Sequence, residues 1–254
     1  MQTVVSEANS GPPVGPDTVW VAVLAVTPAD DLALRALLTD HERAQLTTIQ
    51  STELKRRMIA SMVLNRALLA HVTGGDPGDW AVLADARGAP TAWLNGKRQA
   101  LQTSRSRSEG MVAAAVSARI RIGVDIEALG AHGADSSLAR QFFSLSEIEA
   151  LEVSDLSARE DLFFRIWTLK EAYIKARGLG FLLPLDSFAL IPTADGIRFQ
   201  PPADDVGGNW QFHSTGPSTQ HRLAIACENP ASDIRQGTAS LDPSSGEIRF
   251  QFSA

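Results

Sequence analysis

The sequence predicts an α+β fold, on two observations. Two long segments, one opening at Thr52 and one spanning Ala158–Ala176, repeat apolar residues at the spacing of buried helices. Short runs rich in Val, Ala and Ile surround both segments and are bounded by Gly, Pro and Asp turns, as strands are. The chain has 254 residues, which is long for one compact core and sufficient for two small domains.

The first half is expected to hold strands around one long helix. That helix opens at Thr52 as N-cap, carries Leu54 and Met58 on its apolar side, and ends near Gly74. The other expected elements are a strand at Val19–Val26, short helices at Ala33–Leu38 and His41–Gln50, strands at Trp80–Ala84 and Ala92–Leu94, and an antiparallel pair of Met111–Ser117 with Arg121–Ile126.

The second half is expected to hold two helices followed by short strands. Gly130–Ser137 reads as a loop, and Ser144 with Glu147 forms the Ser-x-x-Glu start of a helix that ends at Leu151. The long helix Ala158–Ala176 follows. The expected strands of the tail are Ser187–Ile191, Ile197–Gln200, Asn209–His213, Arg222–Cys227 and Glu247–Phe252. No residue-level repeat relates the two halves.

Composition excludes several classes of function. The formal net charge is −6, whereas a nucleic-acid-binding protein is more often basic, so no nucleic acid is expected as a partner. No apolar run approaches the length of a membrane span. Cys227 is the only cysteine, so intramolecular disulfides are impossible and a cytoplasmic location fits. We expect Cys227 to be an inert core thiol.

Residues 163–178 carry charge where a buried helix should not. Apolar residues, Phe163 and Trp167 among them, form two adjacent stripes, yet Lys170, Glu171 and Lys175 lie within the pattern. Glu171 and Lys175 are four residues apart and share one face. Charges among aromatic side chains need a ligand, a metal or each other, so the segment indicates a binding site. The alternative is a surface ion pair between Glu171 and Lys175.

The short strand Ile122–Glu127 carries a second signal. Asp125 and Glu127 are two residues apart, so both carboxylates leave the same face of the strand. Together with Glu171 they would suit a hard divalent cation such as Mg²⁺, which prefers oxygen ligands. The alternative is that both residues face solvent on a half-exposed strand.

The sequence Gly-Val-Asp-Ile-Glu at 123–127, followed by Trp-Thr-Leu-Lys-Glu-Ala-Tyr-Ile-Lys at 167–175, resembles the paired signature of the 4′-phosphopantetheinyl transferases. The resemblance is to the larger, Sfp-like type that modifies carrier proteins of secondary metabolism, including antibiotic biosynthesis. It implies a pseudo-dimer of two similar α+β halves with a cofactor cleft between them. The expected division is a flexible lead-in at 1–16, an N-terminal half at 17–121 and a C-terminal half at 122–254.

The resemblance also implies a reaction. Such an enzyme transfers the 4′-phosphopantetheine arm of coenzyme A to a serine of an apo acyl or peptidyl carrier protein, requires Mg²⁺ and releases 3′,5′-ADP. A monomer is expected. The residues that match family positions are metal ligands Asp125, Glu127 and Glu171, catalytic residues Glu127, Glu171 and Lys175, and cofactor-binding residues Arg57, Ser104, Arg105, Lys170 and Lys175. Either Glu127 or Glu171 would take the proton from the serine.

Two departures from the family pattern leave alternatives open. Gln-Thr-Ser-Arg-Ser at 102–106 stands where the family usually shows Asn-Leu-Ser-His-Ser, so Arg105 replaces a histidine in what is expected to be a loop. Ala89 replaces a lysine, for which Lys97 or Arg98 would compensate. The chain is therefore also consistent with a divergent relative that uses the cleft for another reaction on a carrier- or coenzyme A-linked substrate, or with a non-catalytic binding partner.

Overall fold

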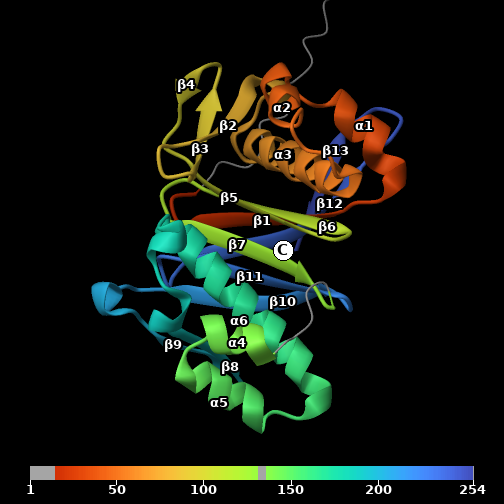
Figure 1. The fold of residues 1–254 in the computed structure, drawn as a ribbon. Helices are drawn as coiled ribbons and strands as arrows, with labels where there is room; N and C mark the ends of the chain where they lie inside the picture. The colour runs from red at the N-terminus through yellow and green to blue at the C-terminus, as the bar shows by residue number, and fades with distance from the viewer. Residues whose placement is uncertain (1–14, 131–135, 254) are drawn as a thin grey trace, which may run out of the picture.

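Two β-sheets lie face to face in the middle of the molecule, and each has a long helix on its outer face (Figure 1). The computed structural model describes residues 15–130 and 136–253. The helices are α1 (Asp31–Ala36), α2 (Asp40–Gln45), α3 (Thr52–Thr73), α4 (Ser136–Phe142), α5 (Leu145–Val153) and α6 (Leu156–Arg177). None of the helices in the described part of the chain is long and apolar enough to cross a membrane.

The first sheet has five strands in the order β13-β12-β1-β6-β5, and the second has three in the order β10-β11-β7. Two small sheets, β2-β3-β4 and β8-β9, stand at their margins. The strands are β1 (Thr18–Ala25), β2 (Trp80–Ala84), β3 (Pro90–Leu94), β4 (Lys97–Arg98), β5 (Gln102–Ser108), β6 (Met111–Ser117), β7 (Ile122–Ala128), β8 (Ala189–Thr193), β9 (Gly196–Gln200), β10 (Gln211–Ser218), β11 (His221–Cys227), β12 (Asp233–Leu241) and β13 (Ile248–Phe252).

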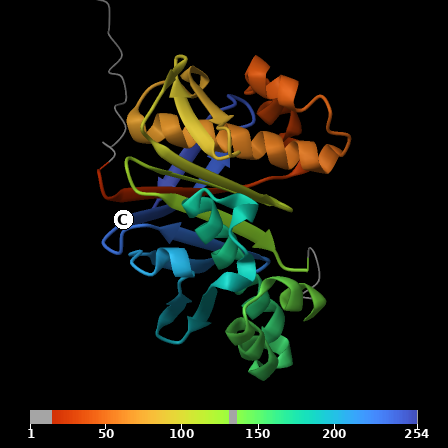
Figure 2. The same cartoon turned by 60° about the vertical axis from the view of Figure 1, so that its left-hand side comes forward.

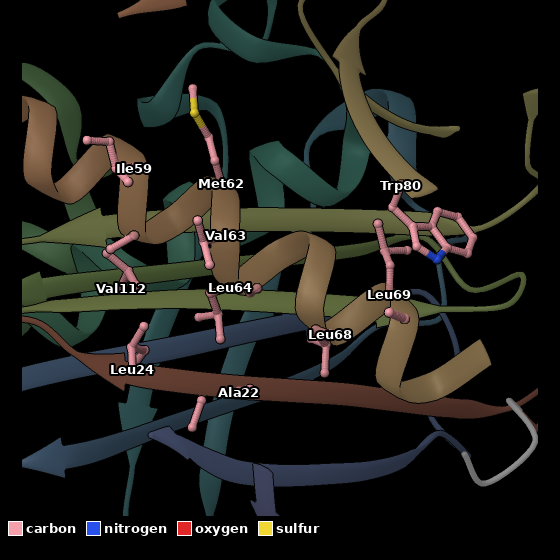
Figure 3. Packing of buried hydrophobic residues seen from close by; sticks show 14 of the residues in the cluster. Ala22, Leu24, Ile59, Met62, Val63, Leu64, Leu68, Leu69, Trp80 and Val112 are labelled. Atoms are coloured by element: carbon pink, nitrogen blue, oxygen red, sulfur yellow. The ribbon is translucent and has the colours of Figure 1, made fainter. Parts of the chain in front are cut away.

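Strand β1 is buried on both faces and therefore joins two cores. Its side chains alternate between two cores. One set packs with α3 (Trp20, Ala22, Leu24), and the other packs between the two sheets (Val19, Val21, Val23). Figure 3 shows the first of these cores, where Leu64 and other side chains of α3 meet Ala22 and Leu24. The α-β-β-α layering that results is also clear in the rotated view of Figure 2.

The long helix α3 begins one residue earlier than its sequence suggests. Ser51, not Thr52, is the N-cap, because its side chain accepts a hydrogen bond from the backbone N–H of Leu54. The predicted end is confirmed, since Gly74 closes the helix with φ of 81°. The second long helix, predicted at Ala158–Ala176, is confirmed as α6 and is longer by two residues at its start and one at its end.

Helix α6 lies against β7 and β11, and Gly123 sets how closely it approaches. A Cβ at Gly123 would lie 1.8 Å from the backbone oxygen of Ala172 and 2.7 Å from the backbone nitrogen of Ala176. Neither atom can move without shifting the helix. The glycine of the Gly-Val-Asp-Ile-Glu segment is therefore required by packing between a strand and a helix backbone.

We predict that Gly123→Ala destabilises the protein by about 1–3 kcal/mol or more, because the clash is with backbone rather than with a flexible side chain. Urea unfolding followed by circular dichroism measures this change. Gly207→Ala is the matched control, since nothing lies within 4 Å of a Cβ placed there. An unchanged midpoint for Gly123→Ala would contradict the packing argument.

Several sequence-based expectations are corrected. The predicted pairing of Met111–Ser117 with Arg121–Ile126 is wrong, because β6 pairs with β1 and β5 while β7 pairs with β11 in the other sheet. The segment expected as a loop around Arg105 is strand β5. Of the predicted loop Gly130–Ser137, residues 131–135 lie outside the described residues and the last two begin α4.

The α+β class is confirmed. The pseudo-dimeric relation of the halves and the division at residues 121 and 122 stay predictions, as does the lead-in at 1–16, most of which lies outside the described residues. The structure adds one fact to this division. Strands β12 and β13, which come from the end of the chain, complete the N-terminal sheet: β12 pairs in parallel with β1. Residues 233–252 therefore belong to the same sheet as β1, β5 and β6, although they follow the strands of the second sheet in the sequence.

Candidate functional site

The site forms where the edge strands of the two main sheets meet. β5 is the last strand of one sheet and β7 the last strand of the other. On β5, Ser104, Ser106 and Ser108 alternate with Arg105 and Arg107, so the hydroxyls leave one face and the guanidinium groups leave the other. The serines contact β7, and the arginines border a cavity. Strand β5 therefore presents hydroxyl groups to β7 and guanidinium groups to the cavity.

Asp125 is buried and is held by two donors on the same oxygen. Its Oδ1 accepts a hydrogen bond from Ser106 Oγ at 2.7 Å and forms an ion pair with Lys175 Nζ at 2.6 Å. Lys175 Nζ also donates to the backbone oxygen of Val124 at 3.2 Å. The interpretation of Asp125 as a solvent-facing residue is therefore wrong. The surface-pair interpretation of Lys175 is also wrong, because among the described residues Lys175 forms its ion pair with Asp125 and not with Glu171.

The carboxylates of Glu127 and Glu171 lie close enough to Asp125 for its charge to raise their pKa values. Burial, followed by the charges of Asp125 and Glu171, raises the pKa of Glu127 to about 8 against the opposing effects of Lys175 and a hydrogen bond from Ser108. Burial and the charge of Asp125 likewise raise the pKa of Glu171, which Lys175 partly offsets. The three predicted ligands are thus brought into one region, with more negative charge than one lysine balances.

The chemistry of these carboxylates suits a cation, although the described residues hold no preformed metal-binding group. Within residues 15–130 and 136–253, no three His, Cys, Asp or Glu side chains are already gathered around a common point as a metal-binding group. However, the second carboxylate oxygen of Asp125, Oδ2, is buried without a hydrogen-bond partner among those residues, an arrangement that is costly unless a ligand supplies one. A divalent cation would also keep Glu127 and Glu171 charged. The donor set, all oxygen, suits Mg²⁺.

A cavity of about 670 Å³ opens beside this region, between elements of both halves. Its volume lies in the range of sites for small molecules and cofactors. Glu171 and Lys175 line it, whereas Asp125, Glu127, Arg57 and Lys170 are not among its lining residues. Its walls comprise β2 and the turn after it (Val82, Leu83, Ala84, Arg87, Gly88, Ala89, Pro90), β5 (Thr103, Ser104, Arg105, Arg107), α4 (Gln141, Phe142), α6 (Trp167, Glu171, Ile174, Lys175) and the segment after α6 (Gly178, Gly180, Leu183, Pro184, Leu185, Asp186).

The wall formed by β5 is cationic, because Arg105 and Arg107 both line the cavity there. Burial and the neighbouring charge of Arg107 lower the pKa of Arg105, and burial and Arg57 lower the pKa of Arg107. Guanidinium groups remain charged nonetheless. Neither Arg105 nor Arg107 forms a hydrogen bond or ion pair with another residue in the described ranges, although the charge of Glu42 partly offsets the lowered pKa of Arg105. Arg57 Nε is buried without a hydrogen-bond partner there and lies 3.7 Å from Glu53 Oε1 in an ion pair. Such a group of guanidinium ions is suited to a multiply charged anion.

Two predicted cofactor-binding residues, Arg57 and Lys170, do not line the cavity, and Lys170 lies in a separate buried contact. It is fully buried on the opposite side of α6, where its ammonium contacts Glu147 Oε2 at 2.5 Å and donates to the backbone oxygen of Phe188 at 2.7 Å. Burial lowers its pKa, and Glu147 opposes that effect. The assignment of Lys170 to cofactor binding is corrected to a structural role, because its buried ammonium bonds to Glu147 and Phe188 and does not line the cavity.

Sequence reasoning missed other residues of the cavity. Arg87 and Arg107 both line it, although neither belongs to a recognised motif. Lys97 and Arg98, which were expected to compensate for Ala89, lie exposed on β4 and are not among the lining residues. Arg107 was detectable in principle, because a period of two places it on the same strand face as Arg105.

Comparison with known proteins identifies the family to which the chain belongs. The sequence pattern of the 4′-phosphopantetheinyl transferase superfamily matches residues 121–226, which include β7 and α6. The 4′-phosphopantetheinyl transferase HetI of Nostoc sp. is 33% identical over 161 residues, covering 63% of this chain and 68% of that protein. A putative 4′-phosphopantetheinyl transferase of Synechocystis sp. is 27% identical, with 79% and 83% covered. The chain therefore belongs to the 4′-phosphopantetheinyl transferase superfamily, a family of transferases.

More local likeness is found with Sfp of Bacillus subtilis, which is 39% identical over 75 residues, 30% of this chain and 33% of that protein. Among solved structures, a holo-(acyl-carrier-protein) synthase of Bacillus anthracis, in complex with coenzyme A (3′,5′-ADP), matches 42% of this chain and 95% of its own at 17% identity and a TM-score of 0.38.

Proposed function

We propose that this protein transfers the 4′-phosphopantetheine arm of coenzyme A to a serine of an apo acyl or peptidyl carrier protein, with Mg²⁺ as cofactor and 3′,5′-ADP as the second product. One observation carries the proposal: the two signature segments of the family, on β7 and α6, meet beside a cavity. Another wall of that cavity holds Arg105 and Arg107, which have no ion-pair partner among the described residues. HetI and Sfp, both named as 4′-phosphopantetheinyl transferases, support the same activity.

The reaction moves a phosphoryl group between two oxygens. The serine oxygen forms a bond to the phosphorus that carries the pantetheine arm, and the bond from that phosphorus to 3′,5′-ADP breaks with its electron pair on the departing phosphate. Such transfers need mainly positioning and charge neutralisation. Mg²⁺, held by Asp125, Glu127 and Glu171, would neutralise pyrophosphate oxygens. Glu171 lines the cavity and Glu127 does not, which favours Glu171 as the acceptor of the serine proton.

The cationic residues divide between the two ends of the cofactor. Lys175 borders the cavity beside Asp125 and would stabilise the charge that develops on the leaving 3′,5′-ADP. Ser104 and Arg105, which line the cavity, and Arg57, whose charge acts on the neighbouring Arg107, would bind the remaining phosphate. The cytoplasmic location, the monomeric state and the service to secondary metabolism or antibiotic biosynthesis stay predictions, as does the absence of nucleic acid and membrane partners.

Intact-mass analysis of several apo carrier proteins, incubated with this protein, coenzyme A and Mg²⁺, tests the proposal. The expected result is a mass gain of one phosphopantetheine on the carrier serine, matched by release of 3′,5′-ADP and abolished by EDTA. A carrier that gains no mass while coenzyme A binds to the cavity would instead support the divergent relative, with another reaction or a binding role only.

Arg105 is expected to bind cofactor phosphate in place of the family's histidine. We predict that Arg105→Ala weakens coenzyme A binding by roughly 10- to 100-fold, the equivalent of losing hydrogen bonds to a charged group. If the contact is to the 3′-phosphate, binding of dephospho-coenzyme A changes much less. Isothermal titration calorimetry with both cofactors measures the difference.

Two variants control this measurement. Arg98→Ala removes an exposed guanidinium on β4, outside the lining of the cavity, and should leave both affinities unchanged. Arg105→His should recover part of the affinity below about pH 6.5, where imidazole is charged, and lose it again as the pH rises through that value. Equal coenzyme A affinity in the wild type and Arg105→Ala would show that Arg105 does not contact the cofactor.

A further inference from the structure

The seam between the two sheets is closed by serine side chains and not by a strand ladder. β5 and β7 are edge strands of different sheets, so their backbones do not pair. Ser104 Oγ accepts a hydrogen bond from the backbone N–H of Val124 at 3.1 Å, and Ser108 Oγ accepts one from that of Ala128 at 2.7 Å. Small side chains permit this close approach, and two of their hydroxyls satisfy the backbone N–H groups of Val124 and Ala128 on β7.

The same row of hydroxyls also contacts both carboxylates of β7. Ser106 Oγ donates to Asp125 Oδ1 at 2.7 Å, and Ser108 Oγ donates to Glu127 Oε2 at 3.3 Å. Ser106 is buried, and so is Ser108. Neighbouring members of the row thus engage neighbouring acids, with the same period of two on each strand.

The contact with Asp125 fixes one oxygen and leaves the other open. Ser106 and Lys175 both occupy Oδ1, while Oδ2 is buried without a hydrogen-bond partner in the described residues. Two donors converging on one oxygen set the plane of the carboxylate, and this determines where Oδ2 lies. Residues that orient metal ligands in this way commonly change metal affinity 10- to 100-fold when they are replaced.

We propose that Ser106 and Ser108 are positioning residues, which reach from the N-terminal sheet to hold Asp125 and Glu127 in the orientation that binds the divalent cation. The inference rests on the proposed function for the identity of that cation. In this proposal β5 does more than line the cavity. The orientation of Asp125 and Glu127 depends on how the sheet that contains β5 packs against the sheet that contains β7.

The test compares cation binding with turnover and with stability. Mn²⁺ is titrated into each protein with saturating coenzyme A, and free Mn²⁺ is followed by electron paramagnetic resonance. Ser106→Ala is expected to weaken Mn²⁺ binding about 10-fold. It should raise the Mg²⁺ concentration for half-maximal turnover by a similar factor while the KM for coenzyme A at saturating Mg²⁺ changes little. Ser108→Ala should have a smaller effect, because its contact with the carboxylate is longer.

Ser117→Ala is the matched control for lost stability, since it removes a buried hydroxyl on β6 that donates to the backbone oxygen of Ile120 and touches no carboxylate. It should leave Mn²⁺ affinity unchanged. Ser106→Thr keeps the hydroxyl and should restore Mn²⁺ binding to within a few-fold of the wild type. Wild-type affinity in Ser106→Ala, or an equal loss in Ser117→Ala, would overturn the inference. A wild type that binds Mn²⁺ and coenzyme A but transfers nothing would refute the function instead.

Discussion

Replacing Asp125 with asparagine or alanine is expected to lower turnover at least about 100-fold, a typical cost of losing one essential electrostatic group. Asp125 supplies the buried oxygen Oδ2, which has no hydrogen-bond partner among the described residues, and it forms the ion pair that holds Lys175 at the cavity. Its charge would therefore be needed both to bind the cation and to position Lys175. Glu171→Ala should have an effect of the same order, because Glu171 lines the cavity and its raised pKa suits a proton acceptor. Steady-state rates over a series of Mg²⁺ concentrations measure both.

Asp125→Asn is the more specific test of the charge, since it preserves the shape of the side chain and an acceptor for Ser106. Glu160→Gln, on an exposed position of the same helix as Glu171, is the control and should retain turnover within a few-fold. Unfolding midpoints should show that each variant is folded. Near-normal turnover of Asp125→Asn at limiting Mg²⁺ would contradict the assignment of Asp125 as a metal ligand.

The second large effect is expected on stability, from the buried ion pair of Lys170 and Glu147. Glu147 accepts from Lys170 Nζ and, at 2.7 Å, from the backbone N–H of Leu190, and it closes the capping box with Ser144. It therefore ties α5, α6 and β8 together. Glu147→Ala would leave an ammonium ion buried without its counter-ion, and breaking such a pair costs about 3–5 kcal/mol.

Replacing both residues distinguishes the free energy lost by burying one unpaired charge from the net contribution of the intact ion pair to stability. The double variant Lys170→Met with Glu147→Gln should lose less stability than Glu147→Ala alone, because no charge is then left buried. Asp233→Ala, which breaks an exposed pair with Arg235, should cost less than about 1 kcal/mol. Urea unfolding at neutral pH compares the three. A loss below about 1 kcal/mol in Glu147→Ala would show that Lys170 finds another partner.

The parts of the fold that sequence predicted best are those with a strong apolar period. Helix α6 follows from its two apolar stripes, and α3 from its length and its glycine end. Strand β5 was missed because alternating serine and arginine lack an apolar face, although three of its serines are buried against β7. Burial there depends on hydroxyl groups bonding across to another sheet, which no local pattern reveals.

The acids of β7 and α6 were identified from sequence by residue type and order, but their contacts could not be. Asp125 affects the pKa of both Glu127 and Glu171 in the structure, and the roles of the three as metal ligands stay predictions. Lys170 was misassigned because its partner Glu147 lies 23 residues away, and sequence spacing within α6 does not indicate which charges turn inward. The use of Lys175 with Asp125 rather than with Glu171 likewise depends on the packing of a helix on a strand, which Gly123 permits.

The location of the cation tests the account most directly. Crystals grown with coenzyme A and Mn²⁺ allow the metal to be located by its anomalous scattering. The account predicts one strong peak bound by oxygen atoms of Asp125, Glu127 and Glu171, with the pyrophosphate of coenzyme A completing its shell and Arg105 on a cofactor phosphate. A coenzyme A molecule seated in the cavity with the Mn²⁺ peak absent, or bound away from these three carboxylates, would contradict it.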